Sequence, residues 1–301
     1  MITLLCITME RRIPMKISEI LSKNKATLSF EVFPPKTSDS YKSVETATAE
    51  IAKLKPDFMS VTYGAGGGTS EYTASIASNI QKTENVPTLA HLTCVSSKKE
   101  KVHKQLKLLE EYGIENIMAL RGDRTECDCE DYHYASELIS DIKNLCGDKF
   151  CIGGACYPEC HPESNSLAED IEKLKIKVEA GCEFLTTQMF FDNNILYKYI
   201  FKLREAGVTV PVVAGIMPVT NANQITRICA LSGTYLPSKF KNIVDKFGSD
   251  PDSMKQAGIA YATEQIVDLI ANGVKHIHVY SMNKPDIAEK IQYNLSDIIG
   301  K

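Results

Sequence analysis

A carboxyl group inside an apolar segment is the first candidate for chemistry in this sequence. Glu31 lies in the run SFEVF, which Pro34 and Pro35 end. Burial disfavours the charged form of a carboxyl group, so a glutamate in such a run can keep a proton near neutral pH. That property suits a general acid. The alternative is a carboxylate paired with a neighbouring Arg or Lys, and the run alone does not separate the two readings.

A second candidate is the tripeptide Arg121-Gly122-Asp123, which ends another apolar run. Arg can bind a phosphate through parallel hydrogen bonds, and Asp can stabilise a ring nitrogen or a developing cation. Gly lets the backbone approach a ligand closely. The alternative is an ion pair at the protein surface. The position at the end of a predicted strand favours a ligand site.

Further polar side chains stand at or near the ends of the other apolar runs, where parallel strands would gather them at one edge. They are Thr62, His91, Tyr157, His161, Gln188 and Tyr280. The two histidines could equally be ordinary residues of the rim.

Nucleotide and metal motifs are incomplete. The glycine-rich stretch 64–68 is followed by Thr69 where G-x-G-x-x-G needs its last glycine, so we interpret it as a flexible loop. Cys127 and Cys129 form C-x-C, and Cys156, Cys160 and His161 gather after a predicted strand. The sequence contains no C-x-x-C, so we predict no metal site and favour reduced thiols over zinc or an iron–sulfur cluster.

A repeat of apolar runs and helical segments must position these residues. Glycines typical of helix C-termini precede five of the runs: Gly113, Gly147, Gly181, Gly207 and Gly273. Eight runs are predicted to be buried parallel strands: 27–35, 57–64, 88–94, 116–122, 150–157, 183–190, 210–215 and 276–281. Helix-start signals lie between them, including Ser97 with Glu100, Ser166 with Glu169, and Asp250 before Pro251.

This alternation predicts an α/β fold, a single (β/α)8 TIM-type barrel. The long interval from Gly207 to Gly273 indicates an extra helix around 238–247, before the last barrel helix. A doubly wound open sheet is the alternative. We expect residues 1–14 to be a disordered extension and 15–301 to form one catalytic domain.

Composition limits the classes of function. The 301 residues are 44% hydrophobic, with a net charge of −4, and Lys and Arg are scattered among acidic residues. Nucleic acid is therefore not an expected partner. No apolar run approaches the roughly 18 residues of a membrane helix. Ten cysteines without a secretion signal indicate reduced thiols and a cytoplasmic protein.

Seven motifs occur in an order that resembles methylenetetrahydrofolate reductase of the bacterial single-domain type. They are SFEVFPPKT, SVTYGAGGGTS, AHLTC, MALRGD, YPECHPES, TTQMFFD and GIMPVTN. The resemblance implies an enzyme in which reduced FAD passes hydride to 5,10-methylenetetrahydrofolate, giving 5-methyltetrahydrofolate for one-carbon metabolism and methionine biosynthesis. NADH or NADPH would reduce the flavin.

The resemblance also implies roles for particular residues. Glu31 matches the acid that protonates the folate, and Asp123 matches a carboxylate near both flavin and pterin. Gln188, Asp123 and Tyr280 are the expected substrate-binding residues. The expected FAD-binding residues are Thr62, His91, Leu120, Arg121, Gly122, Asp123, Tyr134, Ala135, Tyr157, His161, Asp170 and Lys177.

Two departures from the family pattern concern the electron donor. Ala222 stands where the family commonly has an aromatic residue, and the segment 124–131 is acidic and contains two cysteines. One alternative is therefore a flavin- and folate-binding subunit that receives electrons from a partner protein. A metal-dependent hydrolase or methyltransferase is a third hypothesis. Because the family is often oligomeric, we expect a homo-oligomer.

Overall fold

The computed structural model describes residues 16–35, 37–63, 70–95, 97–123 and 131–301. The predicted N-terminal extension, the glycine-rich stretch 64–68 and the C-x-C pair lie outside the described residues.

Eight parallel strands form a closed barrel in chain order, from β1 beside β2 round to β8 beside β1. The strands are β1 (Thr27–Val32), β2 (Met59–Val61), β3 (Thr88–Thr93), β4 (Asn116–Leu120), β5 (Cys151–Cys156), β6 (Phe184–Thr187), β7 (Val212–Ile216) and β8 (His276–Tyr280). Seven of these strands lie inside a predicted apolar run, and β7 extends one residue beyond its run, to Ile216. The predicted barrel is confirmed, and the doubly wound alternative is wrong because β1 and β8 pair along five residues.

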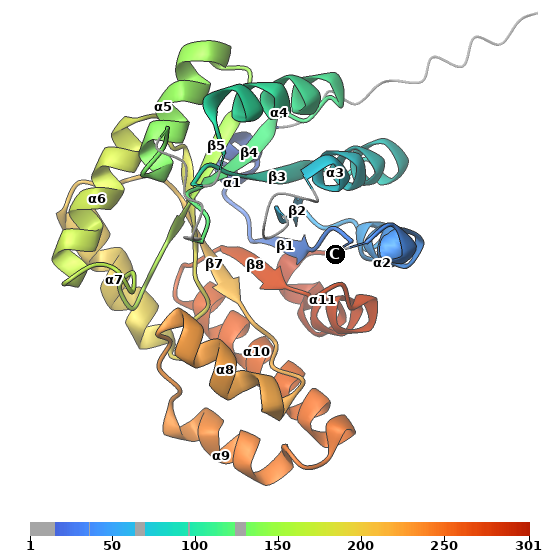
Figure 1. Cartoon of the computed structure of the whole chain (residues 1–301). Coiled ribbons are helices and arrows are strands. Elements are labelled where there is room, and N and C mark those ends of the chain that lie inside the picture. Colours follow the sequence, from blue (N-terminus) through green and yellow to red (C-terminus); the bar gives the residue numbers. More distant parts are fainter. Residues whose placement is uncertain (1–15, 36, 64–69, 96, 124–130) are drawn as a thin grey trace, which may run out of the picture.

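Helices surround this barrel, apart from the first, which packs against side chains of the barrel interior (Figure 1). They are α1 (Ile17–Leu21), α2 (Tyr41–Lys53), α3 (Ser70–Glu84), α4 (Lys99–Glu111), α5 (Ala135–Cys146), α6 (Leu167–Glu179), α7 (Asn193–Glu205), α8 (Ala222–Ser232), α9 (Ser238–Phe247), α10 (Pro251–Ala271) and α11 (Pro285–Ile299), with a 3-10 turn η1 (Ser38–Ser40). The predicted extra helix is α9, which lies outside the ring together with α8 (Figure 1).

Local signals explain several helix ends. All five glycines predicted at helix C-termini have positive φ, from +57° to +116°, where an L side chain would be strained. At the N-termini, Asp250 accepts a hydrogen bond from the N–H of Ser253 at 2.6 Å, and Ser166 Oγ accepts one from the N–H of Glu169 at 3.2 Å. These two caps are confirmed.

The predicted cap at Ser97 is wrong. Helix α4 begins after Lys98, which makes no side-chain cap. Asp131 caps the helix instead, because its Oδ2 accepts a hydrogen bond from the N–H of Lys99 at 2.9 Å. A carboxylate from the segment after β4 therefore satisfies an unpaired helix donor that a local residue was expected to satisfy.

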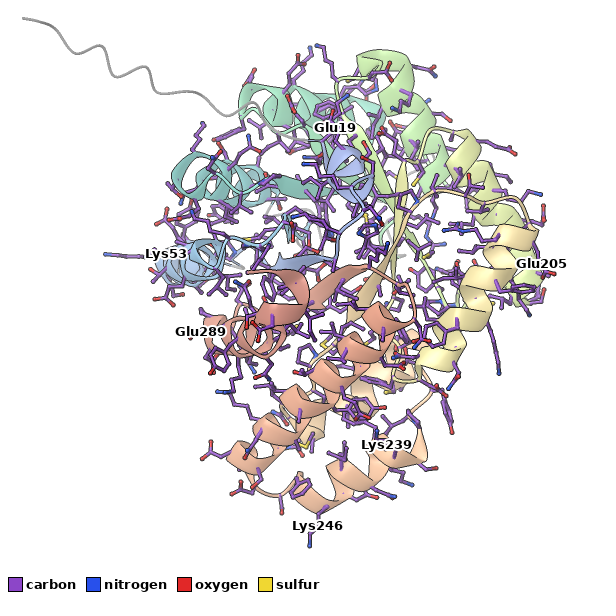
Figure 2. All side chains as sticks on the ribbon, turned by 180° about the vertical axis from the view of Figure 1, so that it is seen from behind. Glu19, Lys53, Glu205, Lys239, Lys246 and Glu289 are labelled. Carbon is purple, nitrogen blue, oxygen red and sulfur yellow. The ribbon has the colours of Figure 1, made fainter. Side chains whose placement is uncertain are left out.

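The lower part of the barrel interior is apolar. Helix α1 packs there against inward-facing side chains such as Leu89, Met118 and Phe184. Phe184 requires Gly153 on the neighbouring strand, since a Cβ at that glycine would stand 2.4 Å from the phenyl ring. Seen from the opposite side to Figure 1, side chains occupy the space between strands and helices, with Glu19 of α1 on that face (Figure 2). The polar side chains gather at the other end of the barrel.

Candidate active site at the carboxyl ends of the strands

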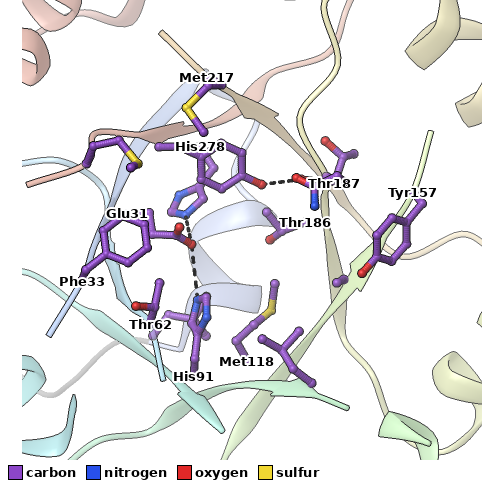
Figure 3. Close-up of a pocket in the computed structure, with 16 residues that line it drawn as sticks. Glu31, Phe33, Thr62, His91, Met118, Tyr157, Thr186, Thr187, Met217 and His278 are labelled. Carbon is purple, nitrogen blue, oxygen red and sulfur yellow. Dashed lines mark hydrogen bonds and ion pairs between the residues drawn. The ribbon is translucent and has the colours of Figure 1, made fainter. Parts of the chain in front are cut away.

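A cavity of about 290 Å³ opens at the carboxyl ends of the strands. Its lining residues are Glu31, Phe33, Thr62, Leu89, His91, Met118, Leu120, Ala155, Tyr157, Thr186, Thr187, Gln188, Met217, His278, Tyr280 and Met282 (Figure 3). Seven of the residues singled out from the sequence are among them: Glu31, Thr62, His91, Leu120, Tyr157, Gln188 and Tyr280. The fold thus brings together side chains from seven strands or the segments that follow them.

Glu31 is a buried carboxyl group with 8% of its surface exposed. Its Oε2 lies 3.6 Å from Nε2 of His91 and 3.9 Å from Nε2 of His278 (Figure 3). Ser60 Oγ is 3.4 Å from the same oxygen. The neighbours of this carboxyl group are therefore two histidines and a hydroxyl, rather than the Arg or Lys of the alternative reading.

His91 is neutral at physiological pH. Burial lowers its pKa to about 4, against an opposing effect of the Glu31 carboxylate. Because its imidazole carries no charge, His91 does not form a salt bridge with Glu31, and the contact between the two side chains is a polar contact of a neutral ring.

This depressed pKa predicts acid sensitivity. The ordinary pKa of His is about 6.5, so as pH falls from 6.5 towards 4 the unfolded chain binds a proton that folded His91 does not. Above pH 6.5, His91 is neutral in both states and does not lower the free energy of unfolding. Below pH 6.5, proton binding to this histidine in the unfolded chain lowers the free energy of unfolding progressively. We expect His91→Gln to lose about 2 kcal/mol less stability than wild type between pH 7 and pH 4.5. Urea unfolding at both pH values measures this, and equal losses would contradict it.

Tyr280 reaches across the cavity to β6. Its hydroxyl donates a hydrogen bond to the carbonyl oxygen of Thr187 at 2.5 Å, and Thr187 Oγ1 accepts one from the N–H of Gly215 at 2.9 Å. Burial raises the pKa of Tyr280 well above its usual value, so the hydroxyl stays protonated and able to donate. Gly215 makes the arrangement possible, since a Cβ there would lie 2.3 Å from both the Thr187 oxygen and the Tyr280 hydroxyl.

Gly215→Ala is therefore expected to displace Tyr280. The Thr187 oxygen belongs to the backbone and cannot move away easily, so we expect a loss of about 1–3 kcal/mol in unfolding free energy. Tyr280→Phe is the matched control because it removes only the hydroxyl, at about 1 kcal/mol. Denaturant titration of both variants checks the order. An alanine variant as stable as wild type would show that the crowding is relieved at no cost.

Two further residues line the wall formed by β5 and β6. Gln188 Oε1 accepts a hydrogen bond from the N–H of Met189 at 2.9 Å, which orients its side-chain amide. The Tyr157 ring meets the His161 ring edge-on at 4.6 Å between centroids. Burial raises the pKa of Tyr157 to about 12, although Arg121 opposes the shift.

The other predicted residues lie beside the cavity rather than in its wall. Arg121 binds Glu163 through two hydrogen bonds of 2.6 and 2.7 Å. Asp170 accepts a hydrogen bond from the N–H of His161 at 3.0 Å, and half-buried Lys177 donates one to the carbonyl of the lining residue Ala155 at 2.6 Å. The structure thus gathers Arg121, His161, Asp170 and Lys177 around the carboxyl end of β5.

Asp123, Gly122, Tyr134 and Ala135 stand farther out. Asp123 is exposed but acts electrostatically on Arg121 and Tyr157, so it lies on the same rim. Tyr134 is 53% exposed and precedes Ala135, the first residue of α5. Gly122 has a φ of +89°, and a Cβ there would lie 3.1 Å from Thr93, so a glycine at this position also accommodates the neighbouring strand.

His278 is the main cavity residue that sequence reasoning missed. The run HIHVY alternates, so His278 shares its strand face with Tyr280, and this periodicity could have identified it. Phe33, Met217 and Met282 were also missed. They lie near the carboxyl ends of predicted strands but carry no polar group that would single them out.

The cysteines expected near His161 do not converge. Cys156 is buried on the outer face of β5, where burial raises the pKa of its thiol against a hydrogen bond with Tyr199 and the charge of Lys177. Cys160 is half-buried in the segment that follows β5. Within the described ranges, no three His, Cys, Asp or Glu side chains are placed to hold a metal ion. Among the helices described, none is both long and apolar enough to cross a membrane.

Comparisons with known proteins agree with this geometry. The family model described as methylenetetrahydrofolate reductase matches residues 16–296. The 5,10-methylenetetrahydrofolate reductase of Pectobacterium carotovorum is 33% identical over 273 residues, covering 91% of each chain. That of Escherichia coli is 32% identical and covers 91% of this chain and 92% of its own length.

Plant and structural relatives extend the comparison. Methylenetetrahydrofolate reductase (NADH) 1 of Arabidopsis thaliana is 33% identical over 295 residues, and the chain spans about half the length of this relative. A solved structure from Clostridium thermocellum, titled as binding two copies of 5-methyl-5,6,7,8-tetrahydrofolic acid, superposes with a TM-score of 0.63 at 15% identity, covering 95% of this chain and 99% of its own. At that identity the likeness supports the fold alone.

Proposed function

The chain belongs to the methylenetetrahydrofolate reductase family, and from this premise we propose that it reduces 5,10-methylenetetrahydrofolate to 5-methyltetrahydrofolate, with FAD as hydride carrier and NADH or NADPH as electron source. The observation that carries the proposal is Glu31, a buried carboxyl group in the wall of the cavity. A carboxyl group at this place could donate a proton to a ring that contains a basic nitrogen and so open that ring.

The residues beside the cavity suit FAD. Two basic side chains, Arg121 and Lys177, lie near the carboxyl end of β5, and such groups suit the diphosphate of a dinucleotide. Burial lowers the pKa of the neighbouring His161, whose imidazole can still donate a hydrogen bond. We propose that Arg121, Gly122, Tyr134, Ala135, Asp170 and the other residues predicted from the sequence hold FAD along β2 to β5 and the segments that follow these strands. Bound FAD would supply the hydride.

The protein's own groups would carry the remaining chemistry. Glu31 gives its proton to a nitrogen of the five-membered folate ring, which opens to an iminium ion ready to accept hydride. The carboxylate of Asp123, on the rim, stabilises the positive charge that develops on the iminium ion. Gln188 and Tyr280 bind the pterin from β6 and β8. The apolar members of the lining, such as Phe33, Met118 and Met217, would limit the access of water and so strengthen each of these interactions.

A visible spectrum and two half-reactions test the proposal. We expect the purified protein to be yellow, anaerobic NADH or NADPH to bleach the flavin, and methylenetetrahydrofolate to restore the colour. A colourless protein with no affinity for FAD would refute it. Bleaching by an artificial donor such as dithionite but not by NADH or NADPH would instead identify a subunit that receives electrons from a partner protein.

We also propose a cytoplasmic homo-oligomer. Three large apolar side chains on the outer helices α5, α6 and α7 are more than half exposed: Leu145 at 53%, Ile176 at 56% and Phe201 at 64%. Such side chains suit contacts between subunits.

A further inference from the structure

A chain of hydrogen-bonding groups leads from Glu31 down into the barrel. Ser60 of β2 lies beside Glu31 in the strand register, and its Oγ is 2.9 Å from Nε2 of His278. We infer that Ser60 and His278 form a proton relay with Glu31, in which His278 stores the proton that Glu31 gives to the substrate. This inference rests on the proposed function and adds two residues to its mechanism.

The hydrogen bonds of Ser29 determine which ring nitrogen of His278 carries a proton. Ser29 Oγ donates its only proton to the carbonyl oxygen of Ile277 at 2.9 Å. The same oxygen is 2.7 Å from Nδ1 of His278, so it must accept a hydrogen bond there. Nδ1 therefore carries a proton, which leaves Nε2 to gain or lose one towards Ser60. Stacking on Phe58, with centroids 5.6 Å apart and planes at 11°, holds the ring in this orientation.

The Ser60 hydroxyl also has only one proton for two partners. When His278 is neutral, Ser60 donates to Nε2; when His278 carries a second proton, Ser60 accepts from Nε2 and donates to Glu31 Oε2, 3.4 Å away. The two arrangements use the same heavy-atom positions. A small rotation of one hydroxyl interconverts them, so proton movement here requires no rearrangement of the fold.

The step balances in protons. Starting from an imidazolium at His278 and a carboxylate at Glu31, Ser60 passes its hydroxyl proton to Oε2 as it receives the Nε2 proton. The products are neutral His278, an unchanged Ser60 hydroxyl and protonated Glu31, which then protonates the substrate nitrogen. Water that enters the cavity after product leaves returns one proton to the pair.

Other groups around the relay do not replace it. His91 approaches Glu31 from β3, but burial keeps it neutral at physiological pH. Tyr280, beside Glu31 on β8, donates its proton to the Thr187 carbonyl. The charge-bearing groups that face His278 are thus Glu31 and, at acidic pH only, His91.

Ser60→Ala tests the relay with little change in volume. We expect normal flavin content and normal flavin reduction, but a folate half-reaction slowed roughly 10- to 100-fold. The rate is also measured in mixtures of H2O and D2O. A plot of the wild-type rate against deuterium fraction should be curved, because two protons move in the relay, whereas the plot for Ser60→Ala should be a straight line. The pH profile of this half-reaction should also change, and Ser60→Thr should restore both features.

Ser281→Ala is the matched control. Ser281 is equally buried and its Oγ donates to the backbone carbonyl of Glu31 at 2.7 Å, but it is outside the relay. We expect this variant to keep the curved isotope dependence and the wild-type pH profile. If Ser60→Ala also keeps both, or if Ser281→Ala changes them in the same way, the relay is refuted and Ser60 acts by packing alone.

A measurement without flavin or folate separates this inference from the proposed function. The protein is labelled with ¹⁵N-histidine, and the signals of His278 are identified because the variant His278→Asn lacks them. Nδ1 of His278 should then resonate as a protonated nitrogen throughout the accessible pH range. A protonated Nε2 with bare Nδ1 would overturn the relay even in an active enzyme. A wild type that does not reduce folate would refute the proposed function and leave this result standing.

Discussion

Glu31→Gln is expected to slow reduction of methylenetetrahydrofolate by about 10²–10⁴-fold while leaving flavin content and flavin reduction near wild type. Glutamine keeps the shape of glutamate and can hydrogen-bond to Ser60 and His91, but it cannot donate a proton to the substrate nitrogen. Because the side chain is buried beneath the cavity, bulk water is a poor substitute. Stopped-flow absorbance of the two half-reactions, recorded separately, gives the measurement.

The matched control for this variant is Thr186→Val, which removes a hydroxyl from the same cavity wall without removing an acid. We expect it to affect the folate half-reaction much less. Normal folate reduction by Glu31→Gln would show that another group supplies the proton. A loss of flavin from the variant would instead indicate that Glu31 supports the cofactor site.

Asp123→Asn is expected to produce the second largest effect, a fall of about 10²-fold in the rate of folate reduction. Asp123 lies on the rim close enough to influence Arg121 and Tyr157, and the proposed mechanism places its charge near both the flavin and the substrate cation. Removing a negative charge should also move the flavin midpoint potential to a more positive value. Photoreduction against a reference dye measures the potential, and stopped-flow absorbance the rate.

Glu163→Gln is the control, since it makes the same change of charge on the same rim. Glu163 pairs with Arg121 and has no proposed contact with the substrate. An equal loss of rate and an equal change in potential in both variants would mean that rim charge in general, and not Asp123 in particular, determines the chemistry.

The elements of the fold could be predicted from local signals. A strand such as His276–Tyr280 shows its face through alternation, and helix ends such as Gly113 and Asp250 show themselves through residue type. These signals depend on backbone conformation and short-range hydrogen bonds, which neighbouring residues determine. The cap of α4 could not be found in this way because its acceptor, Asp131, comes from beyond the next strand.

The candidate site was predicted in part for the same reason. The residue types at strand ends identified Glu31, Gln188 and Tyr280 as members of one cavity wall, because parallel strands in a barrel must end at a common edge. Which members meet could not be predicted. Ser60 and His278 are 218 residues apart, and their contact depends on how the strands are staggered when the barrel closes.

The sequence alone determined the order of strands and helices, the polar composition of their carboxyl ends and the resemblance to a family. The tertiary structure decided that Glu31 faces His91 and His278 instead of a lysine or arginine, that Gly215 leaves room for the Tyr280 hydroxyl, and that Arg121 pairs with Glu163. The physical reason is the distance along the chain over which each kind of interaction acts. Backbone preferences act over a few residues, whereas the protonation and orientation of a buried side chain depend on every strand that surrounds it.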